Sequence, residues 1–336
     1  MKILFFSSPI GLGHVSRDLA VAIELRRRGV KVVFSTGGLA VRLVKAYGFK
    51  VFKLNEVPRF RIVNGALRGL LTWFFLYLTY LLRGLRRCLD AIRLVKPDLI
   101  VVDEEYSALL TLALLRRKCV FITDVPELPL TGFYRFFSVP VNLALKTLLK
   151  FTCKMVVVPE KGVSSGFIRY VGPISRPFTV DREETRRKLG VEKWLVTVLS
   201  SGWGLGEFLL KEVVRVARKL KGVKVVVVGP VKHRYKEVLN LGFIPDAQNL
   251  VLASDLVICL AGKGAIDEAR VAGTPFIAIP VKGHPEQERN ASLHGFKHED
   301  LKRLGELIPK LLGKRRKPEK NGVYELVNLL ETLLVK

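Results

Sequence analysis

Several features that define common protein classes are scarce in this sequence or missing from it. Only four cysteines occur in 336 residues, and their spacing matches no metal-binding pattern. Neither a disulfide framework nor a zinc cluster is therefore indicated. The apolar stretch before Pro9 and Gly11 is too short for a signal peptide. These absences predict a cytoplasmic protein with buried, reduced thiols.

Acidic residues are also few, 30 against 56 Lys and Arg, which leaves a formal net charge of +26. An excess of this size predicts an anionic partner: nucleic acid, anionic lipid or a phosphorylated substrate. Because 49% of the residues are hydrophobic, the chain is expected to fold rather than to be disordered. At roughly 100–200 residues per domain, its length predicts two domains.

Short apolar runs alternate with helical patterns along both halves of the chain. This alternation predicts an α/β fold of parallel sheets with helices on both faces. The expected strands are residues 2–6, 31–34, 50–54, 99–102, 119–123, 155–158, 195–199, 223–228, 256–260 and 276–279. A Pro- and Gly-rich crossing at 172–177 marks a domain boundary. We predict domains over 1–174 and 175–321, and a C-terminal helix within 322–336 that packs back on the first domain.

The first expected strand is followed by Gly11–Leu12–Gly13–His14, with Ser16 as the expected N-cap of the next helix. Gly11 and Gly13 let a ligand approach the backbone, and a helix N-terminus favours negative charge. His14 could act as a general base there. It could equally serve only to hydrogen-bond the turn.

Three acidic residues follow the expected strand at 99–102: Asp103, Glu104 and Glu105. Asp103 could orient His14 or bind a substrate hydroxyl. The alternative is a charge cluster that stabilises a helix N-terminus, which is favoured for Glu104 and Glu105.

In the second half, the strand at 195–199 leads into a loop of hydroxyls and glycines before a helix. Free backbone N–H groups at a helix start suit a phosphate, although no Gly-Lys-Ser/Thr follows to make a Walker loop. The alternative is a flexible turn. The loop residues taken as phosphate-binding candidates are Ser200, Ser201, Gly202 and Gly204.

Residues 241–291 read as two further strand–loop–helix units. Gly262–Lys263–Gly264 opens a helix that carries Glu268, and Gly273 followed by Pro275 ends it. A carboxylate one turn into a helix can bind both hydroxyls of a ribose, and Glu286–Gln287 can bind a hexose. Each could instead be a capping residue. Because ligands bind at the carboxyl ends of parallel strands, this edge is the predicted ligand site.

Two stretches of the first half combine aromatic and basic residues: 69–82, which Arg residues flank on both sides, and 132–154, which mixes Phe and Tyr with Lys and Arg. Residues 69–82 carry no charge over 14 residues and would span about 21 Å as a helix, short of the ~30 Å hydrocarbon core. Such surfaces suit an anionic membrane interface; the alternative is a core helix beside a basic surface. The membrane or acceptor candidates are Trp73, Phe74, Phe75, Arg83, Arg86, Arg87, Phe136 and Phe137.

Taken together, these residues resemble the GT-B glycosyltransferases, and most closely the MurG-type, family 28-type enzymes that use UDP-N-acetylglucosamine and lipid-linked acceptors. Residues 11–14 are similar to the family's Gly-x-Gly-Gly-His loop, one Gly shorter, and 172–176 to its interdomain Gly-Asn-Pro-Val-Arg, ending here in Arg176. Phe243–Ile244 matches the pair that receives the uracil, and Glu268 matches the ribose-binding Glu. Residues 286–291 resemble the Asp-Gln-x-x-Asn-Ala signature that holds the donor sugar. Ala265 replaces a Thr or Ser of the relatives, and Lys263 could substitute as a point charge.

The resemblance implies two Rossmann-like, doubly wound domains facing a cleft, with the UDP-sugar on the second domain. His14, aided by Asp103, would remove the proton of an acceptor hydroxyl, which attacks the anomeric carbon with inversion. Neither a cofactor nor a metal is expected, since no Asp-x-Asp motif is present. The implied partners are a UDP-sugar, carrying N-acetylglucosamine or glucose, a lipid-linked acceptor and an anionic membrane surface, with the protein peripheral on the inner face of the membrane.

Two other functions fit parts of the sequence. A UDP-sugar hydrolase or epimerase of the same fold would need no membrane-facing surface. A non-enzymatic nucleic-acid-binding protein would explain the positive charge, but no nucleic-acid-binding motif accompanies it.

Overall fold

The computed structural model describes residues 1–125, 138–200, 206–231 and 235–335. The chain divides into two compact units. Unit 1 comprises Met1–Arg59, Leu70–Ile174 and Asn321–Lys336, and unit 2 comprises Phe60–Gly69 and Ser175–Lys320. The prediction placed residues 60–69 in the first domain, whereas the structure places them in unit 2.

Unit 1 is built on a seven-stranded parallel sheet with the strand order β3-β2-β1-β6-β7-β8-β9. Its strands are near-continuous apolar runs, as expected for parallel strands covered on both faces; in β1 (Lys2–Ser7) every residue after Lys2 is buried. The other strands are β2 (Lys31–Thr36), β3 (Lys50–Lys53), β6 (Leu99–Asp103), β7 (Cys119–Ile122), β8 (Cys153–Val158) and β9 (Ile168–Tyr170).

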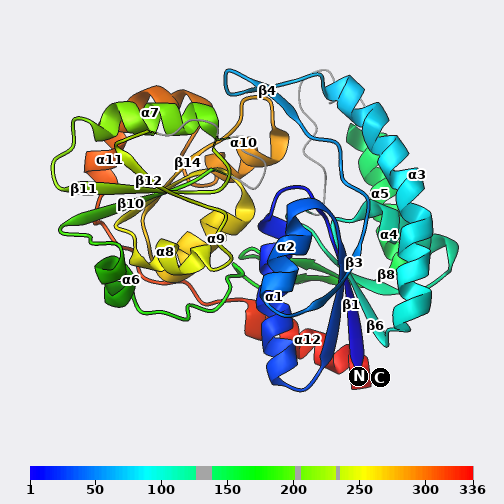
Figure 1. The fold of residues 1–336 in the computed structure, drawn as a ribbon. Coiled ribbons are helices and arrows are strands. Elements are labelled where there is room, and N and C mark those ends of the chain that lie inside the picture. Colours follow the sequence, from blue (N-terminus) through cyan, green and yellow to red (C-terminus); the bar gives the residue numbers. More distant parts are fainter. Residues whose placement is uncertain (126–137, 201–205, 232–234, 336) are drawn as a thin grey trace. The chain divides into compact units, whose positions relative to one another are not determined.

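Helices of unit 1 form a layer on each face of this sheet (Figure 1). In one layer, α1 (Gly13–Arg27) packs against both α2 (Gly38–Ala46) and α12 (Val323–Val335). In the other, α4 (Tyr106–Leu114) packs against both α3 (Leu70–Val95) and α5 (Ser138–Thr152). The α12 segment is further tied to α1 by the ion pair of Arg28 and Glu331, whose atoms lie 2.7 Å apart.

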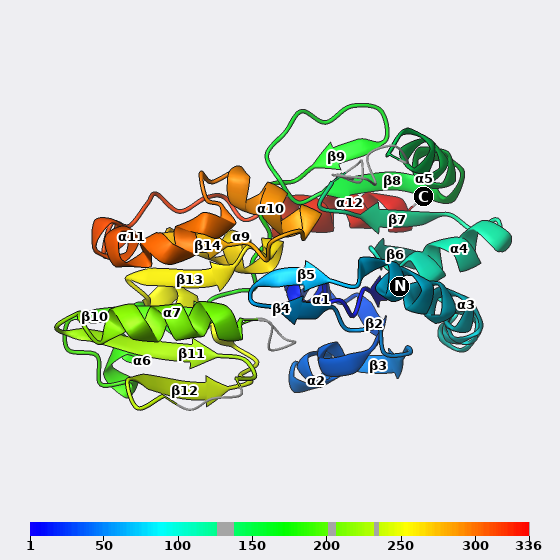
Figure 2. The ribbon, with the colours of Figure 1, turned by 90° about the horizontal axis from the view of Figure 1, so that it is seen from above.

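Unit 2 repeats the plan on a five-stranded parallel sheet with the order β12-β11-β10-β13-β14, drawn from above in Figure 2. Its strands are β10 (Trp194–Leu199), β11 (Val223–Val228), β12 (Val238–Gly242), β13 (Leu256–Leu260) and β14 (Phe276–Ile279). One helical layer holds α6 (Arg182–Lys188), α8 (Ala247–Ala253) and α9 (Lys263–Ala272). The other holds α7 (Glu207–Ala217), the 3₁₀ helix η2 (His298–Arg303) and α11 (Leu304–Leu311), and α10 (Pro285–Ser292) follows β14.

The predicted α/β fold with doubly wound parallel sheets is confirmed, and each predicted strand is present within one or two residues. Three elements were missed: β9, β12, and an antiparallel hairpin of β4 (Arg61–Val63) and β5 (Ala66–Arg68). The prediction of Ser16 as an N-cap is wrong, because α1 already begins at Gly13.

In each sheet the strand order reverses at one point: between β1 and β6 in unit 1, and between β10 and β13 in unit 2. The loops that follow these strands diverge to opposite faces and open a crevice where ligands of doubly wound sheets bind. The predicted residues His14 and Asp103 follow the first pair of strands, and Ser200 and Gly262 follow the second. Both sets therefore lie at topological switch points.

Candidate active site

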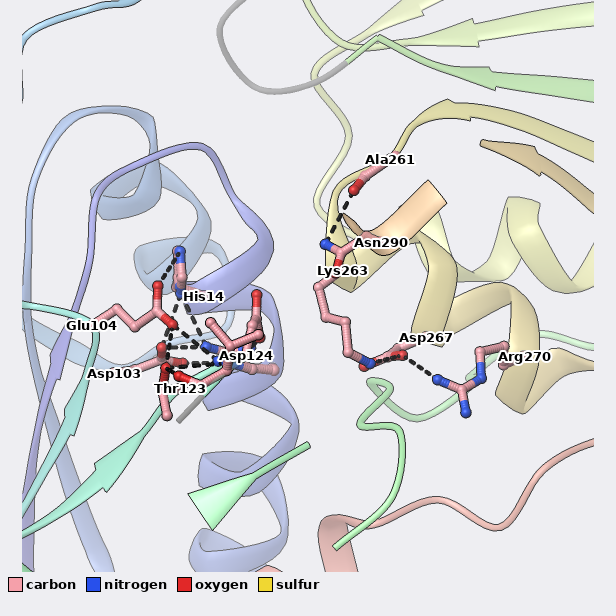
Figure 3. Close-up of polar contacts among 12 residues, drawn as sticks. His14, Asp103, Glu104, Thr123, Asp124, Ala261, Lys263, Asp267, Arg270 and Asn290 are labelled. Carbon is pink, nitrogen blue, oxygen red and sulfur yellow. Dashed lines mark hydrogen bonds and ion pairs between the residues drawn. The ribbon is translucent and has the colours of Figure 1, made fainter. Parts of the chain in front are cut away.

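His14 and Asp103 meet at the switch point of unit 1. His14 is the second residue of α1 and only 8% exposed, and Asp103 ends β6 and is fully buried. Their Nδ1 and Oδ1 atoms lie 2.9 Å apart (Figure 3). With its Nδ1–H donated to the carboxylate, the ring presents Nε2 as the atom that can exchange a proton.

Arg17 completes this pair and was not predicted. It lies three residues after His14 on α1, on the same helical face, and is buried. Its Nε donates to Asp103 Oδ2 and one terminal nitrogen donates to Asp103 Oδ1, both at 2.5 Å, while its other terminal nitrogen donates to Asp124. Asp124 follows β7, so three neighbouring strand ends contribute to one cluster.

Charge within this cluster shifts the pKa of both members of the pair. Burial alone would lower the pKa of His14, but the charge of Asp103 and its hydrogen bond raise it to about 10. Burial alone would raise the pKa of Asp103, yet Arg17 and His14 hold it well below its usual range. The imidazolium–carboxylate form is therefore the stable one near neutral pH without substrate.

Glu104 and Glu105 make different hydrogen bonds. Glu105 is the N-cap of α4: its carboxylate accepts from the backbone N–H of Ser107 at 3.2 Å and from the Tyr80 hydroxyl at 2.5 Å. Glu104 accepts from the Thr123 hydroxyl at 2.7 Å and from the backbone N–H of Asp124 at 2.9 Å. The helix-terminus interpretation thus holds for Glu105 and not for Glu104.

In unit 2, Arg176 and Glu268 form a buried ion pair. The Nε and one terminal nitrogen of Arg176 donate to the same oxygen, Glu268 Oε1, at 3.1 and 3.0 Å. The other terminal nitrogen donates to the carbonyl of Pro245, just after Phe243–Ile244. Three predicted donor contacts from distant parts of the sequence are thereby brought together.

Lys263 and Asp267 lie one turn apart on α9, and the Nζ of Lys263 donates to the Asp267 carboxylate (Figure 3). Arg270 donates to the same Asp267 oxygen at 3.3 Å and to both oxygens of Glu319 at 3.0 Å. The Lys263 side chain is 7% exposed. To contact a phosphate as predicted, it would have to leave Asp267.

The glycine candidates lie at loop or helix starts, and Gly11 has a positive φ of 71°. Gly262 is the N-cap of α9 and makes no side-chain capping bond. The N-cap side chain therefore does not occupy the first backbone N–H groups of α9, which lie at the positive end of the helix dipole. Ser200 is buried and donates to the carbonyl of Val228 at 3.0 Å. Gly13 and Gly264 lie in the first turns of α1 and α9. Ser201, Gly202 and Gly204 lie outside the described residues.

Gln287 and Glu286 begin α10. The side-chain oxygen of Gln287 accepts from the backbone N–H of Val281 at 3.0 Å, which shapes the loop before the helix. Asn290 belongs to the signature at 286–291 but was not among the predicted contacts. It is buried and donates to the carbonyl of Ala261 at 3.2 Å (Figure 3). Gln287 and Asn290 thus join the loop after β14 to the loop after β13.

The sequence and the fold are similar to those of known glycosyltransferases. Residues 222–298 match the glycosyltransferase family 28 C-terminal domain. An uncharacterized glycosyltransferase of Methanosarcina acetivorans is 28% identical over 324 residues, covering 87% of this chain and 83% of the relative. The UDP-N-acetylglucosamine–N-acetylmuramyl-(pentapeptide) pyrophosphoryl-undecaprenol N-acetylglucosamine transferase of Caldicellulosiruptor saccharolyticus is 24% identical, covering 87% and 81%. The crystal structure of Acinetobacter baumannii MurG superposes with a TM-score of 0.60 at 17% identity, covering 98% and 99% of the two chains.

This chain is a glycosyltransferase with the GT-B fold, and part of its second unit is similar to the family 28 C-terminal domain. The matched domain spans the candidates from Phe243 to Gln287 in unit 2. In the glycosyltransferase, these predicted donor residues therefore fall within the family match, whereas His14 and Asp103 lie outside it.

The glycosyltransferase also has a large apolar surface on unit 1. The outer side of α3 exposes Phe75 at 65% and Leu82 at 70%, with Phe74 at 50%. Trp73 is half-buried and donates to the carbonyl of Pro58 at 2.8 Å, while Arg83, Arg86 and Arg87 are exposed. Phe136 and Phe137 lie outside the described residues.

The residues that the structure describes include neither a membrane-spanning helix nor a metal-binding cluster. Among the described helices, none is long and apolar enough to cross a membrane. Within residues 1–125, 138–200, 206–231 and 235–335, no group of His, Cys, Asp and Glu side chains is arranged to hold a metal ion.

The hairpin of residues 61–68 reaches the loop before α10. Leu67 N donates to Lys282 O at 2.8 Å, and Lys282 N donates to Gly65 O at 2.9 Å. In Figure 1 the blue hairpin lies next to the orange loop that precedes α10. Ile62 and Leu67 pack against the core of unit 2. A sequence signal was present: Asn64–Gly65 between β-type residues is typical of a two-residue hairpin turn.

Proposed function

We propose that this glycosyltransferase moves a hexose, N-acetylglucosamine or glucose, from a UDP-sugar to a hydroxyl of a lipid-linked acceptor, with inversion at the anomeric carbon. The observation that carries the proposal is the buried His14–Asp103 pair at a topological switch point. Asp103 fixes the imidazole at Nδ1, and Nε2 would receive the proton of the acceptor hydroxyl. A single base and a direct displacement give inversion.

The donor part of the proposal rests on unit 2. The diphosphate would lie at the N-terminus of α9, whose dipole and first N–H groups favour an anion. The ribose would contact Glu268, which Arg176 holds in place. Phe243–Ile244 would take the base, and Glu286–Gln287 the sugar. The C. saccharolyticus relative, whose name specifies UDP-N-acetylglucosamine, supports this choice of donor.

The chemical step would proceed at His14. The step starts from neutral His14, which must first lose its Nε2 proton. As the acceptor oxygen attacks the anomeric carbon, the hydroxyl proton passes to Nε2, and the bond from that carbon to the diphosphate breaks. Asp103 stabilises the imidazolium that forms and keeps the ring in one orientation. Arg17 in turn fixes Asp103 through two hydrogen bonds. General-base catalysis of this kind contributes about 10²–10⁴-fold to the rate.

The acceptor part of the proposal rests on the apolar face of α3, defined here by Leu71, Phe74, Phe75, Leu76, Leu78 and Leu82. Exposed apolar surface of this extent marks an interaction site, and Arg83, Arg86 and Arg87 follow it on the same helix. We propose that this face contacts an anionic membrane that contains the acceptor, on its cytoplasmic side, without spanning it.

The decisive experiment is a panel of radiolabelled UDP-sugars incubated with total lipid extract and resolved by lipid chromatography. Label that moves to a lipid fraction supports transfer and identifies the donor. Free labelled sugar without labelled lipid, for every donor tested, would instead indicate a hydrolase. A chelator such as EDTA should leave transfer unchanged, because no metal takes part in the proposed step.

Two further measurements test the catalytic base and the membrane-facing surface separately. His14→Ala should lower turnover at least 100-fold while UDP still raises the melting temperature; full activity would remove His14 from the base role.

Flotation with vesicles containing anionic lipid should recover the protein, and Phe75→Ser should weaken that recovery. Equal flotation of both proteins would contradict the assignment of this face.

A further inference from the structure

Glu104 has a backbone conformation that side chains rarely adopt. Its φ is 46°, in the left-handed region, which is strained for a residue with a Cβ. The conformation is held by three hydrogen bonds: its N–H donates to Ile122 O at 3.3 Å, and its Oε1 accepts from Thr123 and Asp124. Strained residues of this kind concentrate at functional sites.

This conformation directs the second carboxylate oxygen at His14. Glu104 Oε2 lies 3.9 Å from His14 Nε2, too far for a direct hydrogen bond. A single oxygen atom can lie about 2.7–3.0 Å from both atoms at once. The space thus suits one hydroxyl group that contacts both. Asp103, on the other side of the ring, is fully buried, while the Glu104 side chain is 18% exposed and can be reached.

We propose that Glu104 is a second catalytic residue: its Oε2 and the Nε2 of His14 both contact the acceptor hydroxyl, and the two groups share one proton before the reaction. This inference rests on the proposed function and names the base of that site. The base is then the His14–Glu104 pair, oriented from behind by Asp103 and Arg17.

The proton count of the step is balanced. Before reaction, the pair holds one proton and the acceptor hydroxyl its own. When the oxygen bonds to the anomeric carbon, the bond to the diphosphate breaks with its electron pair. The hydroxyl proton then passes to the pair, which holds two protons until solvent takes one. The products are the glycoside and the nucleoside diphosphate.

The charges around the pair agree with a shared proton. Burial and the charge of Asp124 raise the pKa of Glu104, although His14 and Arg17 oppose this. The pKa of His14 is also raised. Carboxylates outnumber cations here, so a proton is retained. The groups facing the pair are Arg17 and Asp18 of α1, Asp103 of β6, Asp124 after β7 and Glu105 at the start of α4.

The test is the pH dependence of kcat/KM in Glu104→Gln, which keeps an oxygen for Thr123 and Asp124. We expect kcat near neutral pH to fall about 100-fold, with the KM values for donor and acceptor nearly unchanged. The acid limb of the profile should move to higher pH, because His14 alone must then lose its proton while Asp103 still raises its pKa. If His14 were the only base, removal of the Glu104 charge would lower its pKa and move the limb to lower pH.

Further variants keep the outcome decisive. Glu104→Asp retains the charge on a shorter side chain, so kcat should fall while the acid limb stays where it is in the wild type. The exposed Glu56→Gln, also in unit 1, is the matched control and should leave both quantities unchanged. If Glu104→Gln had the kcat of the wild type, or if its acid limb moved to lower pH, the inference about Glu104 would be overturned and the proposed function would stand. Failure of the wild-type protein to transfer any sugar would contradict the proposed function, and the inference with it.

Discussion

Buried charges are balanced differently at the switch points of the two units: unit 1 has an excess of carboxylates, and unit 2 has paired charges. In unit 1, five carboxylates surround two cationic groups, Arg17 and His14; they belong to Asp18, Asp103, Glu104, Glu105 and Asp124. In unit 2, Glu268 is paired with Arg176, and Asp267 and Glu319 with Lys263 and Arg270.

This difference has a direct chemical consequence. The excess of buried carboxylate raises the pKa values of His14 and Glu104, which favours retention of a proton within the cluster of unit 1. The balanced pairs of unit 2 hold backbone and loops in place and leave helix N-termini to attract an anion. In the proposed mechanism, unit 1 transfers the proton and unit 2 binds the donor.

The largest effect should come from Asp103→Asn, which removes the centre of the unit 1 cluster. We expect kcat to fall about 10²–10⁴-fold, because His14 loses the group that orients it and Arg17 loses its main partner. The pKa of His14 should fall well below 10, since Asp103 is the charge that raises it. Both are measurable, by initial rates and by NMR titration of the imidazole. An unchanged pKa would contradict this account of the cluster.

In unit 2, breaking the Arg176–Glu268 pair should chiefly affect stability and donor binding. Arg176→Met removes the Arg176 charge from the buried carboxylate of Glu268, at a cost of about 3–5 kcal/mol in the free energy of unfolding. UDP should bind more weakly, which a thermal shift titration would report. The double variant Arg176→Met, Glu268→Gln should recover part of the lost stability. If it recovers none, the two side chains are not coupled.

His14 should also make stability depend on pH. Because its pKa is raised in the folded state to about 10 from 6.5, its contribution is complete below about pH 6.5 and is lost as the pH rises towards 10. Between these values the free energy of unfolding should decline by about 1 kcal/mol per pH unit relative to His14→Gln. Denaturant unfolding of both proteins at pH 7 and pH 8.5 gives the difference. A constant difference would mean that His14 is not charged in the folded protein.

A smaller effect is expected from Gly65→Ala in the hairpin of unit 2. Gly65 has a φ of 76°, and an added Cβ would lie 2.9 Å from a carbon of His298 and 3.1 Å from Phe208. The conformation alone costs about 1–2 kcal/mol. Gly69→Ala is the matched control, because Gly69 has a φ of 67° and a Cβ added there would meet no atom within 4 Å. The melting temperature should fall more for Gly65→Ala, and an equal fall would show that the hairpin yields at this contact.

The smallest effect on stability should come from the apolar face of α3. Phe75 is 65% exposed, so Phe75→Ser should change the free energy of unfolding by less than about 0.5 kcal/mol. An exposed apolar side chain of unit 2 serves as the control: Leu239, which is 40% exposed. Leu239→Ser should leave vesicle binding unchanged, whereas Phe75→Ser should reduce it. A large loss of stability in Phe75→Ser would mean that this side chain is buried by the folded protein.

Local sequence was sufficient for the fold because parallel strands covered on both faces are continuous apolar runs that end in polar loops. It also singled out His14, Asp103, Glu268 and Gln287, since strand ends and helix starts carry them. The hairpin at Asn64–Gly65 had a local signal too, but no local pattern tells which unit a hairpin joins.

The partners of these residues could not be read from the sequence. Arg17 and Asp124 are 107 positions apart, and only the order of β1, β6 and β7 brings them to Asp103. Lys263 looked available for a phosphate, yet its helical neighbour Asp267 binds it. Local patterns determined which groups stand at the strand ends, because burial and backbone propensity act over a few residues. Tertiary structure decided which charges neutralise one another, because electrostatic pairing depends on distances in space rather than along the chain.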